Sequence, residues 1–158
     1  MCVQVRIREA AVEDLPAVVA LWKELMDYHK VLDPIFTRRA GAEETFGTWA
    51  RESIEGDEGC VFVAEGGGEI VGYCQVRISK MPPVLEVEHY GQIHECMVRE
   101  DLRGRGIGQR LVRRARQWCR GKGLGRMEVH YSVQNPAAGE FWTKTGFEPY
   151  LRTLFMAP

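Results

Sequence analysis

The first third of the chain shows one strand-like and two helix-like patterns of apolar and polar residues. Apolar and polar residues alternate over positions 3–7, as they do in a short β-strand. Apolar residues then recur every three or four positions over 15–29, which predicts an amphipathic α-helix. A second, less apolar helix is predicted over 42–54. Its inner face is expected to carry two aromatic residues, Phe46 and Trp49.

Three strands are predicted in the middle of the chain. Residues 60–65 and 69–79 form two apolar runs with strand-like composition, and the three glycines between them, at 66–68, are typical of a hairpin turn. The dipeptide Pro82-Pro83 marks a loop. The apolar run at 90–98 after this loop predicts the third of these strands.

The remainder of the chain predicts two more helices and at least two more strands. The helices are expected at 107–121 and 135–145, and the strands at 126–131 and 147–155, the last being one strand or a pair. The full order, β-α-α-β-β-β-α-β-α-β, predicts a mixed sheet covered by helices on both faces, in the α/β class.

The composition is typical of an ordinary globular protein, and we expect a single domain spanning residues 1–158. The chain is 45% hydrophobic and 27% charged, which allows a sizeable core. No stretch resembles a signal peptide or a transmembrane helix, so we expect a cytoplasmic protein with no membrane partner. Five cysteines and four histidines show neither a disulfide framework nor metal-ligand spacing, so no metal is expected.

The most informative stretch is 96–111, where glycines at 104, 106 and 108 join a predicted strand to a predicted helix. Glycine lets the main chain turn sharply and lets its N–H groups approach a ligand closely. A helix N-terminus adds free N–H groups and a dipole that favours negative charge. From Arg103 to Arg126 there are nine Arg or Lys residues and no Asp or Glu. The stretch therefore predicts a cradle for a phosphate or pyrophosphate.

Two common nucleotide motifs do not fit this cradle. A Walker loop needs Gly, four residues and then Gly-Lys-Ser/Thr, which the chain lacks. A dinucleotide fingerprint needs Gly-x-Gly-x-x-Gly after the first strand of a βαβ unit, whereas these glycines follow several predicted strands.

The stretch instead resembles the acetyl-coenzyme A signature of the GCN5-related N-acetyltransferases (GNAT), Gln/Arg-x-x-Gly-x-Gly/Ala, through Arg103, Gly106 and Gly108. A second block of that family is matched downstream by residues 135–138 and 141–147. In order of elements the resemblance covers 5–155. It implies a GNAT-type fold, with a mixed, mostly antiparallel sheet, helices on both faces, and fourth and fifth strands that splay apart.

The resemblance also implies an activity. The protein would be an N-acetyltransferase, an acyltransferase that uses acetyl-coenzyme A (acetyl-CoA) as cosubstrate and acetylates a primary amine of a small molecule, peptide or protein. The segment between the first two strands would shape the acceptor pocket. The residues that the resemblance implies for cofactor binding are Met97 and Val98 through their main chain, Arg103, Gly104, Arg105, Gly106, Ile107 and Gly108 in the cradle, and Asn135 and Trp142 near the last helix.

A base is needed because an amine is mostly protonated at neutral pH. The candidates are His94 and Glu95, at a place where many relatives carry two consecutive carboxylates. Strand alternation puts His94 on the face of Val98 and Glu95 on the other, unless a bulge intervenes, and this slightly favours His94. The alternative for both residues is a buried polar or substrate-binding group with no proton role.

The sequence gives a weaker indication of the proton donor for the departing thiolate than of the base. Many relatives use a tyrosine where this chain has Trp142, whose indole N–H is not a useful acid. The remaining sources are Tyr131, Tyr150 or water, or the thiolate leaves unassisted. We expect Trp142 to pack beside the cofactor, and Asn135 to cap its helix as well as touch the pantetheine arm.

Two other functions compete with acetyl transfer. The missing tyrosine makes a catalytically inactive CoA-binding sensor the main alternative. Nucleic acid is not expected, because five arginines on one helix, without interleaved aromatic residues, are typical of a solvated face. Residues 1–89 carry 9 basic and 16 acidic side chains and residues 90–158 carry 12 and 6, which favours a cationic acceptor if the acidic half lines the acceptor side. A homodimer is left open.

Overall fold

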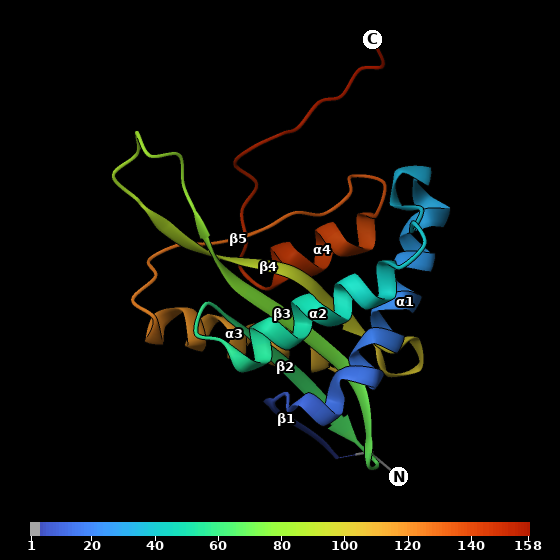
Figure 1. Cartoon of the computed structure of the whole chain (residues 1–158). Coiled ribbons are helices and arrows are strands. Elements are labelled where there is room, and N and C mark those ends of the chain that lie inside the picture. Colours follow the sequence, from blue (N-terminus) through green and yellow to red (C-terminus); the bar gives the residue numbers. More distant parts are fainter. Residues whose placement is uncertain (1–3) are drawn as a thin grey trace.

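The computed structural model describes residues 4–158, so position 3 of the first predicted strand lies outside the described residues. A single five-stranded sheet of order β1-β2-β3-β4-β5 forms the centre of this part of the chain (Figure 1). Neighbouring strands pair antiparallel except β4 and β5, which are parallel. The strands are β1 Val5–Glu9, β2 Gly59–Gly66, β3 Glu69–Lys80, β4 His89–Val98 and β5 Met127–Val129.

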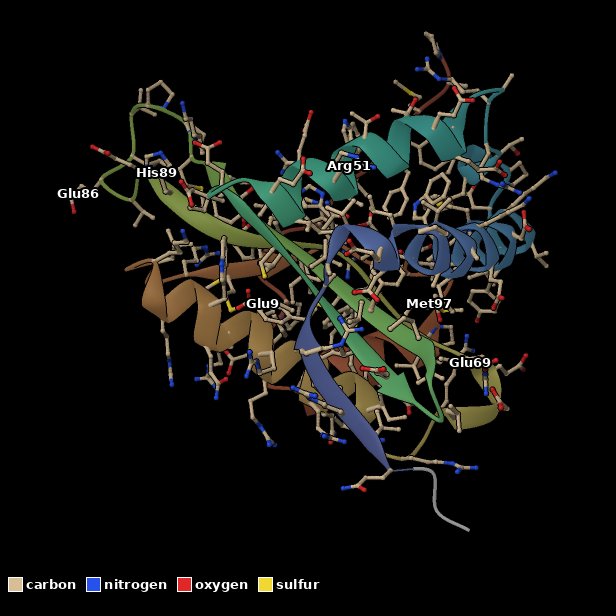
Figure 2. The ribbon with its side chains drawn as sticks, turned by 60° about the horizontal axis from the view of Figure 1, so that its bottom comes forward. Glu9, Arg51, Glu69, Glu86, His89 and Met97 are labelled. Atoms are coloured by element: carbon tan, nitrogen blue, oxygen red, sulfur yellow. The ribbon has the colours of Figure 1, made fainter. Side chains whose placement is uncertain are left out.

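Helices cover both faces of the sheet, as predicted. Figure 2 shows α1 and α2 on one side of the strands and α3 on the other. Three short 3-10 helices, at Val12–Asp14, Pro34–Phe36 and Glu100–Leu102, lie in the connections. The α-helices are α1 Leu15–Leu32, α2 Ala42–Glu55, α3 Ile107–Gly121 and α4 Pro136–Lys144. None of the helices within residues 4–158 is both long and apolar enough to span a bilayer.

The sheet divides the apolar side chains into two cores because successive residues of a strand point to opposite faces. On one face, Val61, Val63 and Tyr73 pack with α1 and α2, where the rings of Trp22 and Phe46 stack at 4.5 Å. On the other face, strand residues such as Phe62, Cys74 and Ile93 pack with α3 and with Trp142 of α4. The two cores hold the sheet between its helical layers.

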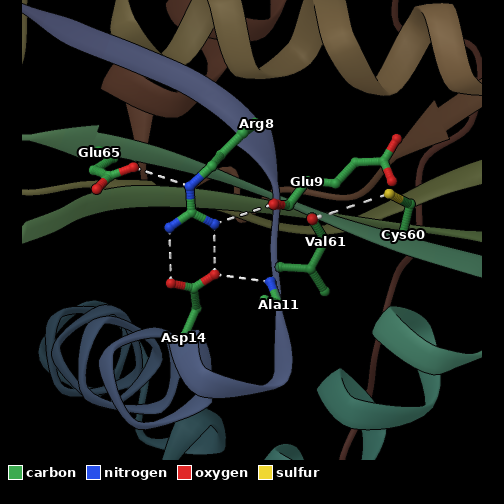
Figure 3. A network of polar contacts seen from close by, with 7 residues as sticks. All are labelled: Arg8, Glu9, Ala11, Asp14, Cys60, Val61 and Glu65. Carbon is green, nitrogen blue, oxygen red and sulfur yellow. Dashed lines mark hydrogen bonds and ion pairs between the residues drawn. The ribbon is translucent and has the colours of Figure 1, made fainter.

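An arginine fastens the first strand to the first helix (Figure 3). Arg8 Nη1 and Nη2 donate to the two carboxylate oxygens of Asp14 at 2.7 and 3.0 Å, and Arg8 Nε donates to Glu65 Oε2 at 2.9 Å. Asp14 Oδ2 also accepts from Ala11 N at 2.8 Å. These charge-assisted bonds fix the direction in which the chain enters α1 and hold the pKa of Asp14 below its usual value.

The inner face of α2 differs from the prediction at one residue. Phe46, Ala50 and Ser53 are buried, at a spacing of four and three residues, whereas Trp49 is 54% exposed. At about 100° per residue, Trp49 is turned by about 60° from Phe46, to the side away from Ala50, and so lies at the border of the buried stripe. The prediction of an inward Trp49 was therefore wrong.

The predicted closing strand over 147–155 is also absent. These residues have no regular secondary structure, and the strand predicted over 126–131 is reduced to the three residues of β5. A strand exists only where a neighbouring strand accepts its hydrogen bonds, and the alternation of apolar residues cannot supply that neighbour. Within residues 4–158, β5 is consequently the last strand of the sheet.

Candidate active site

A fork between β4 and β5 lies at the centre of the candidate site. The two strands pair only from Gly91 opposite Met127 to Ile93 opposite Val129, while β4 continues to Val98. The far half of β4 thus pairs with β3 on one edge and with no strand on the other, within residues 4–158. The predicted splaying of the fourth and fifth strands is confirmed.

The main chain of Val98 faces this fork. Arg99 N donates to Val71 O at 2.8 Å, and neighbouring residues of an antiparallel strand point to opposite edges, so the N–H of Val98 points to the open edge. The carbonyl oxygen of Val98 accepts from Arg103 Nε at 2.9 Å. Met97 is buried against the α1 and α2 face. The end of β4 therefore offers a free N–H beside a carbonyl that is already bonded.

The glycine cradle follows as expected. Gly104 and Gly106 have φ of +73° and +76°, a conformation that glycine adopts without strain, and a Cβ at either position would meet open space. Gly106 directly precedes α3, whose first residue, Ile107, anchors the helix in the core. The cradle thus presents main-chain N–H groups at a helix N-terminus, with room for a ligand beside them.

The two arginines of the cradle are occupied by the protein itself. Arg103 folds back onto β4, where Nη2 also lies 3.7 Å from Met97 Sδ, and Arg105 Nη2 donates to Asp101 O at 3.3 Å. Both side chains therefore brace the loop in this structure. Their implied role in cofactor binding stays a prediction.

Gly108 has a structural role that the sequence did not reveal. A Cβ at this position would lie 3.0 Å from Cε2 of Phe141 and 3.8 Å from Cγ2 of Val98. The third glycine of the cradle is therefore required where α3 meets α4 and the end of β4. The helical spacing of Phe141 in α4 was visible in the sequence, but its partner in α3 was not.

Asn135 and Trp142 position α4. Asn135 is buried, and its Oδ1 accepts from Ala138 N at 3.2 Å, so the predicted N-cap is confirmed. Trp142 is also buried and packs edge-on against Phe141 and Phe147, with ring centroids 4.8 and 5.5 Å apart. The expected packing role of Trp142 is confirmed, whereas contact of either residue with a cofactor stays a prediction.

A β-bulge in β4 changes the placement of the two candidate bases. Gln75 of β3 lies opposite Glu95 and Val76 lies opposite Ile93, so His94 is an extra residue without a partner. The prediction had allowed for such a bulge. Glu95 lies on the opposite face of the strand from Val98, as alternation predicts, whereas Ile93 shares the face of Cys96 because of the bulge. Ile93 and Cys96 both pack toward α3, and Glu95 shares the face of Gln75, whose Nε2 donates to Ser53 Oγ in α2 at 2.9 Å.

Glu95 occupies an apolar setting that favours its protonated form. Burial raises the pKa of its carboxyl group to about 7. Its Oε2 is buried and has no hydrogen-bond partner among residues 4–158. The same is true of Tyr73 Oη and Gln75 Oε1, which belong to the same face of the sheet. Three buried oxygens on this face of the sheet therefore lack a hydrogen-bond partner within residues 4–158, which is unfavourable for each of them.

His94 lies in a different environment. His94 is exposed as a residue. The pKa of its imidazole is nevertheless lowered below 6.5, mainly by partial desolvation and to a smaller extent by electrostatic repulsion from Arg77 and His130. A ring with a lowered pKa is neutral at physiological pH and can accept a proton, though it is a weaker base than an unperturbed histidine. Both candidates thus remain capable of the chemistry, with Glu95 the better matched to neutral pH.

The two tyrosines that could serve as acids lie in different settings, and only Tyr150 makes a side-chain hydrogen bond within residues 4–158. Tyr150 Oη donates to Glu128 Oε1 at 2.8 Å, and the guanidinium of Arg126 lies 4.3 Å from the centre of its ring. The ring of Tyr131 lies against Gly139 of α4, where a Cβ would come within 3.1 Å of it. The two hydroxyl groups thus lie beside β5 and α4 respectively.

The rest of residues 4–158 was compared with the requirements of a metal site and with the position of the fork. No group of three or more His, Cys, Asp or Glu side chains in the described part of the chain is placed to hold a metal ion. A groove of about 740 Å³ runs between β1 and the arginine-bearing side of α3, at the opposite edge of the sheet from the fork.

Comparison with known proteins agrees with this geometry. The model of the acetyltransferase (GNAT) family matches residues 19–147. The chain belongs to the GNAT family. An uncharacterised N-acetyltransferase of Archaeoglobus fulgidus is 31% identical to it over 113 residues, which cover 72% of each chain. Another from Methanocaldococcus jannaschii is 35% identical over 92 residues, 58% of this chain and 40% of that protein.

Solved structures share the GNAT fold. The aminoglycoside N-acetyltransferase AAC(6')-Iy in complex with CoA has a TM-score of 0.77 at 20% identity, covering 100% of this chain and 97% of that chain. The chain spans less than half the length of its Methanocaldococcus relative.

Proposed function

We propose that this GNAT protein is an acetyl-CoA-dependent N-acetyltransferase that acts on a primary amine. The observation that carries the proposal is the fork itself, where the open N–H of Val98 lies three residues from Glu95, a buried carboxyl with a pKa of about 7. A hydrogen-bond donor for an acyl oxygen and a base for an amine are thereby held on one strand.

The chain has a fitting set of groups for CoA. Gly104 and Gly106 leave space beside main-chain N–H groups at the start of α3, which suits a pyrophosphate. The unpaired edge of β4 at Met97 and Val98 would accept the pantetheine arm as an added strand. Asn135, Trp142 and the remaining cradle residues, Arg103, Arg105, Ile107 and Gly108, would form the surrounding walls.

Acetyl-CoA, when bound, supplies a thioester whose acetyl group passes to the amine nitrogen as the C–N bond forms and the C–S bond breaks. The N–H of Val98 would donate to the carbonyl oxygen, where negative charge develops. Glu95 would accept the proton that the amine loses, directly or through water. His94 is the alternative acceptor. The burial of Glu95, its pKa and its unpaired oxygen support the first choice.

The thiolate needs one proton to leave as free CoA. Tyr150 already donates to Glu128, and Tyr131 packs against α4. These contacts favour solvent water as the source of the proton, and Trp142 would act only by packing.

A cationic amine is the acceptor that the charge pattern favours. Helix α2, which packs over the Glu95 face, carries four glutamates and one arginine. A negative field on this side would attract an ammonium group toward the face of the sheet that carries Glu95. Relatives named for both small-molecule and protein acceptors, an aminoglycoside acetyltransferase and the N-alpha-acetyltransferase of Mycobacterium tuberculosis, are consistent with either size of acceptor.

An acceptor screen tests the proposal. The protein is incubated with acetyl-CoA and a panel of polyamines, aminoglycosides, amino acids and peptides, and release of free thiol is followed. We expect amine-dependent release that is strongest with cationic acceptors and is lost in Glu95→Gln. Tight CoA binding without thiol release from any acceptor would instead support the inactive sensor.

A further inference from the structure

The groove of about 740 Å³ between β1 and α3 has a strongly basic lining. Its charged residues are one acid, Glu65, and four arginines, of which one belongs to β1 and three to α3. The whole chain has a formal net charge of -1, so this concentration of positive charge is local. We call the groove with its four arginines the arginine groove; the arginines are Arg6, Arg110, Arg113 and Arg114.

The positive charges of the arginine groove are not balanced by the protein. None of its four arginines forms an ion pair with a carboxylate within residues 4–158. Glu65 is already paired with Arg8, whose Nε lies 2.9 Å from Glu65 Oε2. Arg110 Nη2 donates to Val5 O at 2.9 Å, a neutral partner that leaves the guanidinium its full charge. Four such groups around one groove suit a ligand with several negative charges.

The open edge of β1 faces the same groove. Within residues 4–158, β1 pairs with β2 and with no other strand. Ala10 N donates to Val61 O at 2.8 Å, which shows which residues direct their main chain toward β2. Counting in twos from there, the N–H and C=O groups of Val5, Ile7 and Glu9 point to the open edge. Val5 and Ile7 also line the groove, so an unpaired strand edge and the arginines border one space.

We propose that the arginine groove binds an extended acidic peptide segment of a partner protein, which adds to β1 as a further strand. The main chain of the peptide would bond to the open edge of β1, and its carboxylates would accept from the arginines. β1 is five residues long, so a matching segment of the partner would span roughly 17 Å. Carboxylates at every second position of the peptide would share one face and meet the three arginines of α3.

The lining favours a peptide over a nucleic acid. Proteins that bind single strands of nucleic acid stack the bases on aromatic side chains, and none of the groove's lining residues within 4–158 is aromatic. A phosphate backbone would use the arginines but not the strand edge. Only a peptide main chain supplies the alternating N–H and C=O groups that pair with β1.

The arginine groove is separate from the fork. β1 and β5 are the two outer strands of the sheet, so a peptide on β1 leaves the gap between β4 and β5 open. A partner held at the groove would raise the local concentration of its own amino groups near the fork. Peptide binding does not depend on the proposed acetyl transfer, and the two are measured separately.

Fluorescence anisotropy with a labelled peptide of alternating glutamate and threonine tests the binding. We expect binding that weakens as salt is added, and none by a peptide of alternating lysine and threonine. The variant Arg110→Gln/Arg113→Gln should weaken binding by about tenfold or more. The matched control is Arg116→Gln/Arg120→Gln, which removes the same charge from exposed positions of α3 outside the groove and should bind as wild type does.

N-methylation of the peptide distinguishes strand addition from charge attraction and uses the wild-type protein. Methyl groups on every second residue remove N–H donors and keep every carboxylate. The peptide methylated on the set that faces β1 should lose binding, whereas the peptide methylated on the alternate set should keep it. Hydrogen exchange at the amides of Ile7 and Glu9 should slow when the unmodified peptide is bound.

Four results would each overturn the proposal. They are no binding of the acidic peptide, equal weakening by the two double variants, equal effects of the two methylation patterns, and unchanged exchange at Ile7 and Glu9. A single-stranded oligonucleotide that binds more tightly than the peptide, and is lost in Arg110→Gln/Arg113→Gln, would assign the groove to nucleic acid instead.

Discussion

A Cβ on Gly108 would lie 3.0 Å from the ring of Phe141, so α3 and α4 approach each other closely because residue 108 has no side chain. Gly108→Val should therefore destabilise the protein by about 1–3 kcal/mol through overpacking, before any effect on ligand binding. Urea unfolding in the absence of CoA measures this loss. Unchanged stability would show that the two helices can separate without penalty.

The cradle is better tested at Gly106, where a side chain meets no protein atom. Asparagine tolerates the left-handed backbone conformation of Gly106 and would place its amide in the phosphate site. Gly106→Asn should weaken CoA binding by about tenfold or more with a small loss of stability. Calorimetry measures the affinity. Gly123→Asn is the control, because Gly123 has φ of +75° and equally open surroundings beyond the end of α3. Equal affinities in the two variants would remove the cradle from the binding site.

CoA should raise the melting temperature of the protein because a ligand that binds only the folded state stabilises it by mass action. Adenosine 5'-monophosphate, which lacks the pyrophosphate and the pantetheine arm, should raise it much less at the same concentration. Differential scanning fluorimetry with both ligands makes the comparison. Equal shifts would indicate a general nucleotide pocket instead of a fork that binds the pantetheine.

The pH dependence of the reaction distinguishes the two candidate bases. If Glu95 takes the proton, the rate at limiting amine should rise through about pH 7, the pKa that burial gives its carboxyl group. Glu95→Gln should abolish this rise and leave CoA affinity nearly unchanged. A rise centred below pH 6.5 that disappears in His94→Ala would assign the base to His94, whose pKa is lowered. Both variants retaining the wild-type profile would exclude both residues.

The raised pKa of Glu95 should also make the stability of the protein depend on pH. The folded-state pKa of Glu95 is raised from 4.5 to about 7, so the folded protein holds this proton more tightly than the unfolded chain does. The contribution to the free energy of unfolding is complete below about pH 4.5 and is lost as the pH rises through about 7. The free energy of unfolding of Glu95→Gln, measured relative to that of wild type, should therefore increase by up to about 3 kcal/mol as the pH rises between these limits. Urea unfolding of both proteins at acidic and alkaline pH measures the gain. A difference that does not vary with pH would contradict it.

The sequence by itself determined the elements and the chemical class of the site. Apolar periodicity located α1, α3 and the three central strands within a few residues, because burial on one face imposes that spacing on any helix or strand. Gly104 and Gly106 also pointed directly to their conformation, since a left-handed backbone at a helix N-terminus selects glycine locally. Together with the second family block, these local signals were enough to indicate a GNAT-type fold that binds acetyl-CoA.

Tertiary structure decided the features that depend on a partner distant in sequence. The bulge at His94 arises from the register between β3 and β4, which no alternation within one strand reveals. It places Ile93 on the face of Cys96 and leaves His94 without a partner in β3. The close contact of Gly108 with Phe141 depends on how α3 and α4 pack. The segment over 147–155 has the pattern of a strand but pairs with no strand within residues 4–158. In each case a long-range hydrogen bond or packing contact, present or missing, outweighed the local pattern.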